Sequence, residues 1–309
     1  MTTQGDQQPV LVTGATGRQG GAVARALLAQ GTPVRALVRD LHSKGAETLK
    51  ALGADLVLGD FDDRESLLAA CTGARAVFSV HFPDIKNLAS DSERVQGRNL
   101  VEAAKAAGVS HFVHTSVSGV GDDHRSASGK DDGGWWERYW GSKTYIVELV
   151  RSAGFKYWTL LKPAFFMENF VRPSFLFANF VEDRLLTVIA PDTPLALVAL
   201  KDIGAACAAA IGDPEKFNKR EIELAGDLLK MREIAAILSD VWGKRIEAPS
   251  LSPAEALAQG LMPEFVSSQE RMNEEVSPAR PEHAHALGLT TTDFKTWARS
   301  KWPAGQTSV

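Results

Sequence analysis

The feature that most constrains the fold is a regular alternation of two kinds of segment in the first half of the chain. Short apolar runs rich in β-branched residues alternate with amphipathic stretches, and glycines or prolines mark the joins. The runs are Val10–Thr13, Val34–Val38, Ala54–Leu58, Ala74–Val80, Val109–Thr115 and Tyr157–Leu161, and the amphipathic stretches lie at about 19–30, 44–52, 64–71, 88–107 and 136–153. This alternation is typical of βαβ units. Because such crossovers are right-handed, we predict an α/β fold with a Rossmann-type, doubly wound parallel sheet.

The pattern changes after Pro163, where an aromatic-rich segment begins. Two short strands are expected at Leu185–Ala190 and Leu195–Leu200, and a strand at Glu221–Leu224. Helices are expected at about 202–211 and 230–242, followed by short helices punctuated by prolines. We therefore predict a first domain over residues 8–163, together with elements around 195–212, and a smaller mixed α/β domain over residues 164–309.

Composition excludes several classes of protein. The 309 residues include 34 Lys and Arg against 38 Asp and Glu, a net charge of −4, whereas nucleic-acid binders normally carry a basic field. Two cysteines are too few for a disulfide framework or a zinc cluster. No apolar run reaches the roughly 18 residues of a membrane span, and the first residues lack the features of a signal peptide. We expect a cytoplasmic protein that binds a small molecule and does not bind nucleic acid, membranes or metal. The sequence leaves the oligomeric state open.

A glycine-rich turn directly follows the first expected strand. Three glycines at this spacing permit a tight turn, close approach of the backbone to a pyrophosphate, and close packing of helix on strand. The N–H groups and dipole of the helix that opens here then face the phosphates. An ordinary glycine-rich turn is the competing interpretation, but the strand–turn–helix context favours dinucleotide binding. The predicted binding residues of the turn are Gly14, Thr16, Gly17, Arg18, Gln19 and Gly20.

The end of the second strand bears on which dinucleotide is bound. A ribose 2′-hydroxyl calls for an acidic residue there, whereas a 2′-phosphate calls for an arginine. Arg39 lies 19 residues beyond Gly20, close to the expected separation of about 20. Arg35 and Arg18 complete a possible cationic pocket, whereas Asp40 is the competing residue for a hydroxyl. This pattern favours NADP(H) over NAD(H).

After the third strand, Asp60 and Phe61 supply a carboxylate and an aromatic ring where an adenine ring would lie. The next residues, Asp62 and Asp63, are candidates for the same site. Either of them is equally well suited to cap the following helix.

Several motifs together carry a family resemblance. They are GATGRQG at Gly14–Gly20, LVR at Leu37–Arg39, Gly59–Asp60, HTS at His114–Ser116 and LKPAFFMENF at Leu161–Phe170. With these motifs the chain resembles the NmrA-like family, an atypical branch of the short-chain dehydrogenases/reductases, over nearly its whole length. The resemblance implies a Rossmann domain that binds NADP(H) and a small C-terminal domain that forms the other wall of a substrate cleft. The further cofactor-binding positions assigned with it are Asp60, Phe61, Val80, Lys143, Pro163 and Phe166.

Tyr139 and Lys143 form a Tyr-x-x-x-Lys pattern that places a phenol and an ammonium on one helix face. With Ser116, at the end of the fifth strand, they are similar to the Ser, Tyr and Lys arrangement of extended short-chain dehydrogenases. In that arrangement Lys143 would lower the pKa of the phenol and hold the nicotinamide ribose, Tyr139 would exchange a proton with the substrate oxygen, and Ser116 would orient that oxygen. The alternative is that Tyr139 only packs among Trp135, Trp136 and Trp140.

Two functions remain after these observations. The first is an NADPH-dependent reductase of a small apolar carbonyl or quinone, with Ser116, Tyr139 and Lys143 as catalytic residues. The second is a non-catalytic NADP(H) sensor that acts through protein partners, because the family includes both kinds. His81, after the fourth strand, is a further candidate for contact with nicotinamide or substrate.

Overall fold

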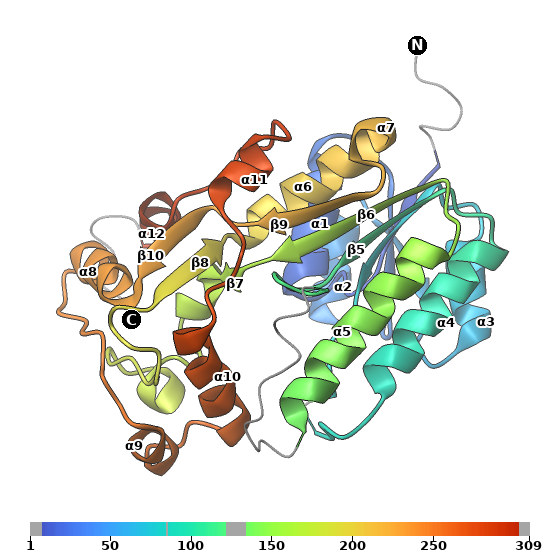
Figure 1. Cartoon of the computed structure of the whole chain (residues 1–309). Coiled ribbons are helices and arrows are strands. Elements are labelled where there is room, and N and C mark those ends of the chain that lie inside the picture. Colours follow the sequence, from blue (N-terminus) through green and yellow to red (C-terminus); the bar gives the residue numbers. More distant parts are fainter. Residues whose placement is uncertain (1–7, 85, 122–133, 303–309) are drawn as a thin grey trace. The chain divides into compact units, whose positions relative to one another are not determined.

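The structure is a computed structural model that describes residues 8–84, 86–121 and 134–302, drawn in Figure 1. The chain divides into two compact units. Of the described residues, 8–84, 86–121, 137–162 and 200–222 belong to the first unit, and 134–136, 163–199 and 223–302 belong to the second. The chain thus leaves the first unit and returns to it.

A seven-stranded sheet forms the centre of the first unit. Its order is β3-β2-β1-β4-β5-β6-β9, and the neighbouring pairs from β3 to β6 are parallel. The strands are β1 (Val10–Val12), β2 (Val34–Val38), β3 (Asp55–Leu58), β4 (Ala76–Val80), β5 (His111–Thr115), β6 (Tyr157–Pro163) and β9 (Arg220–Leu224). The order 3-2-1-4-5-6 is that of a Rossmann fold. The predicted α/β, Rossmann-type fold is confirmed.

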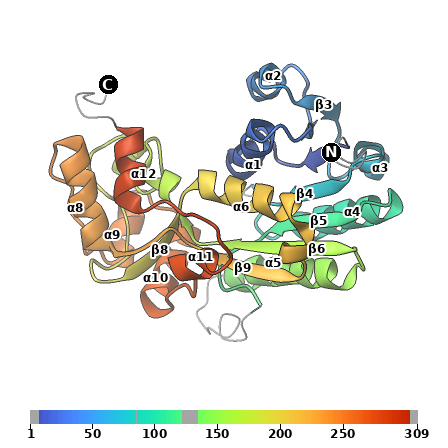
Figure 2. The same cartoon turned by 90° about the horizontal axis from the view of Figure 1, so that it is seen from above.

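Helices cover both faces of this sheet. They are α1 (Arg18–Ala29), α2 (Lys44–Ala51), α3 (Arg64–Cys71), α4 (Ser92–Ala106), α5 (Trp135–Ser152), α6 (Leu200–Gly212) and α7 (Pro214–Phe217). Figure 2 shows α4 and α5 on one face and α1 and α6 on the other. Helices α1 and α6 pack backbone to backbone, because a Cβ on Gly204 would lie 2.6 Å from the Ala22 carbonyl oxygen. Within the described residues, no helix combines the length and apolar character needed to cross a bilayer.

The second unit contains a three-stranded sheet of order β10-β8-β7, made by β7 (Phe165–Phe166), β8 (Pro194–Val198) and β10 (Asp227–Lys230). Its helices are α8 (Met231–Trp242), α9 (Pro253–Ala258), α10 (Pro263–Glu274), α11 (Pro281–His285) and α12 (Phe294–Lys301), with 3₁₀ turns at Met167–Phe170 and Ala178–Phe180. Proline opens α9, α10 and α11, because its fixed φ suits a first helical position and its missing N–H costs nothing there. Phe170, Phe294 and Trp297 lie in the core of this unit.

The strand predicted at Leu185–Ala190 is wrong. Side chains of α10 bind this backbone instead of a neighbouring strand. Gln269 Oε1 accepts from the Val188 N–H at 3.0 Å and from Thr187 Oγ1 at 2.7 Å. Asn273 Oδ1 accepts from the Ala190 N–H at 2.8 Å, and its Nδ2 donates to the Val188 carbonyl at 2.9 Å. Because these polar groups already have partners, the apolar character of the segment does not produce a strand.

Candidate cofactor and catalytic site

The glycine-rich turn after β1 has the close packing that its spacing predicts. Gly14 has a φ of +57°, which favours glycine, and its carbonyl accepts from the Gly17 N–H at 2.9 Å. A Cβ on Gly20 would lie 2.3 Å from the Gly14 carbonyl oxygen, and one on Gly14 would lie 2.7 Å from Val80 Cγ1. Val80, at the end of β4, therefore packs directly against the turn.

The N-terminus of α1 is open for an anion. Gly17 is its N-cap, in an extended conformation and without a capping side chain, so the first N–H groups of the helix point outward, as a phosphate requires. Thr16, Gly17 and Arg18 are exposed beside it. Gln19, by contrast, is buried, and its Oε1 accepts from Thr115 Oγ1 at 2.8 Å. The turn thus fits a dinucleotide pyrophosphate, whereas the Gln19 side chain ties α1 to β5.

The charged residues predicted to bind the cofactor near β2 have different surroundings in the structure. Arg39 is exposed, with no hydrogen bond or ion pair to other described residues. Asp40 is drawn into its own turn, because its Oδ1 accepts from the His42 N–H at 2.8 Å. The phosphate role of Arg35 stays a prediction, but one nitrogen of its side chain has partners elsewhere. Its guanidinium donates to the carbonyls at the end of α3, at 2.8 Å to Ala70 and 2.7 Å to Thr72.

The loop after β3 is held by its own aspartates and by α4. Asp63 caps α3 by accepting from the backbone N–H groups of its first turn, as the capping interpretation predicts. Asp60 Oδ1 accepts from the Asp62 N–H at 2.9 Å. Phe61 is half-buried, and its carbonyl accepts from Asn99 Nδ2 at 2.9 Å. Sequence reasoning missed Asn99, because a lone asparagine within an amphipathic helix gives no signal.

Lys143 lies at the centre of a buried polar cluster. Its Nζ donates to a Glu93 carboxylate oxygen and, at 3.1 Å, to the carbonyl of His81, the residue after β4. The same ammonium lies 5.4 Å from the centre of the Tyr139 ring, one helical turn away on α5. Burial has the largest single effect on the pKa of Lys143 and lowers it, but Glu93 and Tyr139 together raise it more, so the net pKa is raised and the ammonium stays charged.

The pKa of the Tyr139 phenol is raised, not lowered. Burial raises it, the Lys143 charge lowers it, and the Glu93 charge raises it again. The contribution of Lys143 therefore has the predicted sign but is outweighed, and the phenol keeps its proton at neutral pH. The Trp140 ring packs edge-on against Tyr139, with ring centroids 5.7 Å apart. Trp136, on the same helix, is buried and packs against Arg271, 4.7 Å from its guanidinium.

A second group of polar side chains lies between β4 and β5. Ser79 Oγ is 3.0 Å from His81 Nε2 and 3.1 Å from His114 Nδ1, and all three side chains are buried. Burial and the charge of Lys143 lower the pKa of His81 and lower that of His114 to about 3, so both imidazoles are neutral. No sequence motif pointed to Ser79, because its pairing with His114 depends on strand register.

Ser116 directly follows β5 and is buried, and its N–H donates to the Leu161 carbonyl at 2.8 Å. Its hydroxyl has no hydrogen-bond partner within residues 8–84, 86–121 and 134–302. The same holds for His81 Nδ1, His114 Nε2 and Glu93 Oε2. Buried polar atoms nearly always have a partner. These four atoms therefore point to a polar ligand or bound water at this edge of the sheet.

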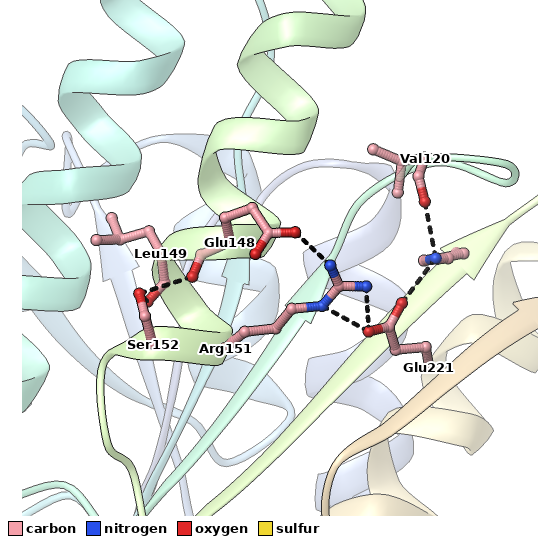
Figure 3. A network of polar contacts seen from close by, with 7 residues as sticks. Val120, Glu148, Leu149, Arg151, Ser152 and Glu221 are labelled. Carbon is pink, nitrogen blue, oxygen red and sulfur yellow. Dashed lines mark hydrogen bonds and ion pairs between the residues drawn. The ribbon is translucent and has the colours of Figure 1, made fainter. Parts of the chain in front are cut away.

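The turn that follows Ser116 is fastened by a charged network, shown in Figure 3. Lys162, at the end of β6, donates to the Val120 carbonyl at 2.8 Å and pairs with Glu221 of β9 at 2.7 Å. Arg151 donates to the other Glu221 oxygen at 2.6 Å and also pairs with Glu148. The returning segment of the first unit thus anchors the turn next to a predicted catalytic residue.

Two predicted cofactor residues belong to the second unit. Pro163 is buried at the end of β6, and Phe166 is half-buried in β7. Phe165 and Phe170, from the same aromatic segment, pack in the core of this unit. Phe170 is therefore a core residue.

The fold and the turn together define a Rossmann-type, dinucleotide-binding class of protein. The comparison with known families agrees, because the model of the NmrA-like family matches residues 6–292. The chain belongs to the NmrA-like family, which includes NAD(P)H-dependent oxidoreductases.

Individual relatives resemble the chain over nearly its whole length. An NAD(P)H azoreductase of Xenophilus azovorans is 30% identical over 277 residues, which cover 89% of this chain and 88% of the relative. The triphenylmethane reductase of Citrobacter sp., solved with NADP(H), superposes with a TM-score of 0.77 at 21% identity, covering 94% of this chain and 99% of the other. NmrA, a negative transcriptional regulator solved with NADP, superposes with a TM-score of 0.74 at 22% identity, covering 96% of each chain.

Proposed function

We propose that the protein is an NADPH-dependent reductase of a small apolar carbonyl or quinone. The observation that carries this proposal is the position of the Tyr139–Lys143 pair. Lys143 is bonded to the carbonyl of His81, which follows β4, so the ammonium stands at the same edge of the sheet as the turn after β1. A protonated phenol and a cation thus lie close to the strand ends where a Rossmann fold holds its nicotinamide.

Three residues of the first unit have separate roles in the proposed reaction. The cofactor supplies a hydride when bound. Tyr139 donates a proton to the substrate oxygen, because its phenol is protonated at neutral pH. The hydroxyl of Ser116 orients that oxygen. Lys143 has three N–H donors, of which Glu93 and His81 engage two, and the third is available to a ribose hydroxyl.

The preference for NADPH over NADH rests on the end of β2. Arg39 is exposed and has no partner within the described ranges, so its guanidinium is available to a 2′-phosphate. Asp40 would have to give up its bond to the His42 N–H to reach a 2′-hydroxyl. A 30% identical relative is named an NAD(P)H azoreductase, which agrees with either nicotinamide cofactor.

The test is NADPH oxidation by the protein with a panel of quinones, aldehydes, imines and azo dyes. The Tyr139→Phe variant is measured alongside, because it removes only the phenolic oxygen. We expect turnover with at least one carbonyl or quinone and a loss of about a hundredfold or more in the variant for a carbonyl acceptor. A quinone needs less proton relay and should be less sensitive to this change.

The opposite result would favour the rival function. If the protein binds NADPH and discriminates against NADH, but no acceptor of the panel leads to NADPH oxidation, it is a sensor of the cofactor and not a reductase. If the Tyr139→Phe variant reduces every carbonyl as fast as the wild type does, Tyr139 has no role in the reaction and only packs beside Trp140.

A further inference from the structure

The ion pair between Glu93 and Lys143 is almost completely shielded from water. The exposed fractions of the two side chains are 3% and 7%. Glu93 comes from the first turn of α4 and Lys143 from α5, so the pair joins two helices on one face of the sheet. Burying two charges costs several kcal/mol per ion, and a well-packed apolar pair is often at least as stable. Stability alone therefore does not explain why carboxylate and ammonium occupy this position.

The pair sets the charge next to Tyr139. Without Glu93, the phenol would face a lone ammonium 5.4 Å from its ring centre. The Glu93 carboxylate offsets part of the effect of this charge on the phenol. His81 of the β4 end and His114 of β5 also face this cluster, and both are neutral. The guanidinium of Arg94, on α4, is directed instead at Ser142 Oγ, 3.3 Å away.

We propose that Glu93 is a positioning residue that offsets the charge of Lys143 and so strengthens the hold of the Tyr139 phenol on its proton, which favours Tyr139 as the proton donor in a reduction. This inference rests on the proposed function. In the reduction, a hydride forms the new C–H bond, the Tyr139 proton forms the new O–H bond, and the resulting phenolate recovers a proton from solvent. The reverse reaction requires a phenolate at the start, which the Glu93 carboxylate disfavours.

The direct test is the titration of tyrosine by its ultraviolet absorption, which needs no substrate. Tyr139→Phe identifies the Tyr139 transition by removing it, since Tyr145 and Tyr157 remain. We expect Glu93→Gln to shift that transition to lower pH by about one unit, equal to a tenfold change in its proton affinity. Glu102→Gln is the matched control, because Glu102 lies on the same helix in an exposed pair with Arg64. No shift in Glu93→Gln, or an equal shift in the control, overturns the proposal.

Lys143→Met changes the charge in the opposite direction, so it distinguishes an electrostatic effect on Tyr139 from a purely structural one. It leaves Glu93 unneutralised, so the Tyr139 transition must move to higher pH. A structural role would move both variants in the same direction. If Glu93→Gln does not fold, Lys143→Met decides alone, and an absent or downward shift refutes the assignment. If the protein turns over no acceptor, the proposed reductase function is refuted. The titration still tests the effect of Glu93 on Tyr139, because it needs no substrate.

Discussion

Replacement of Gly20 by alanine tests the turn after β1 most severely. A Cβ at this position would lie 2.3 Å from the Gly14 carbonyl oxygen and 2.5 Å from that of Thr13. The first distance is about 1 Å shorter than an ordinary van der Waals contact. Both atoms belong to the backbone and cannot rotate away, so either α1 or the turn must shift.

The size of the effect follows from this geometry. Extra methyl groups in packed sites typically cost about 1–3 kcal/mol, and a clash with backbone on two sides belongs at the upper end. At an unfolding entropy of about 2.1 cal/mol/K per residue, a loss of about 3 kcal/mol lowers the midpoint of thermal unfolding by about 5 °C in a chain of this length. A turn displaced by about 1 Å also misplaces the N–H groups that face the phosphates, so NADPH should bind at least about tenfold more weakly.

The assay is thermal unfolding together with calorimetric titration of NADPH. Gly212→Ala is the matched control, because it makes the same chemical change in α6 at a position where a Cβ would meet nothing within 4 Å. We expect the control to unfold close to the wild type or slightly above it. If Gly20→Ala unfolds with the control and binds NADPH as the wild type does, the close-packed turn described above is refuted.

Two further predictions concern charged residues of the first unit. Arg39→Ala should weaken NADPH binding about tenfold to a hundredfold, the value of a charge-assisted hydrogen bond, and leave NADH binding unchanged; an equal loss for both cofactors in calorimetry would contradict its role at a 2′-phosphate. Lys162→Met should destabilise the protein by about 1–3 kcal/mol at neutral pH in denaturant unfolding. Burial raises the pKa of Glu221, but bonds from Lys162 and Arg151 hold it below its usual 4.5, so the stability that the pair contributes is lost as pH falls through that depressed pKa. The difference between wild type and Lys162→Met should therefore narrow below about pH 4.5, and a difference that stays constant from neutral pH into this range would disprove the pairing.

Local patterns were sufficient to predict the Rossmann sheet. Short apolar runs rich in β-branched residues and glycines at the joins are properties of short segments, and β2, for example, spans Val34–Val38 as expected. The turn at Gly14–Gly20 was equally visible, because its function requires glycine at fixed spacing. The prediction was wrong where a segment forms hydrogen bonds with residues far away in the sequence. The amides of Gln269 and Asn273 replace a strand at 185–190, and no local pattern indicates that a helix 80 residues later binds this backbone.

The same reason separates the predicted from the missed residues of the site. Tyr139 and Lys143 lie four residues apart on one helix, so their spacing alone brings them together. Glu93 lies on another helix, and nothing in its neighbourhood marks it as the partner of Lys143. Arg35 was assigned by its charge and strand position, but the nearby end of α3 offers it two carbonyls. Charged side chains are thus easier to find than their partners, because partners depend on the packing of separate elements.

In the proposed reaction, a hydride passes from NADPH to a carbonyl while Tyr139 supplies the proton. The most direct test is single-turnover oxidation of bound NADPH by the aldehydes and quinones of the panel, with NADPH carrying either hydrogen or deuterium at the transferring position of its nicotinamide. We expect oxidation that depends on the acceptor, is slower with deuterium, and is slowed by about a hundredfold or more for aldehydes in Tyr139→Phe. Tight NADPH binding with no acceptor-dependent oxidation would contradict the proposed reaction.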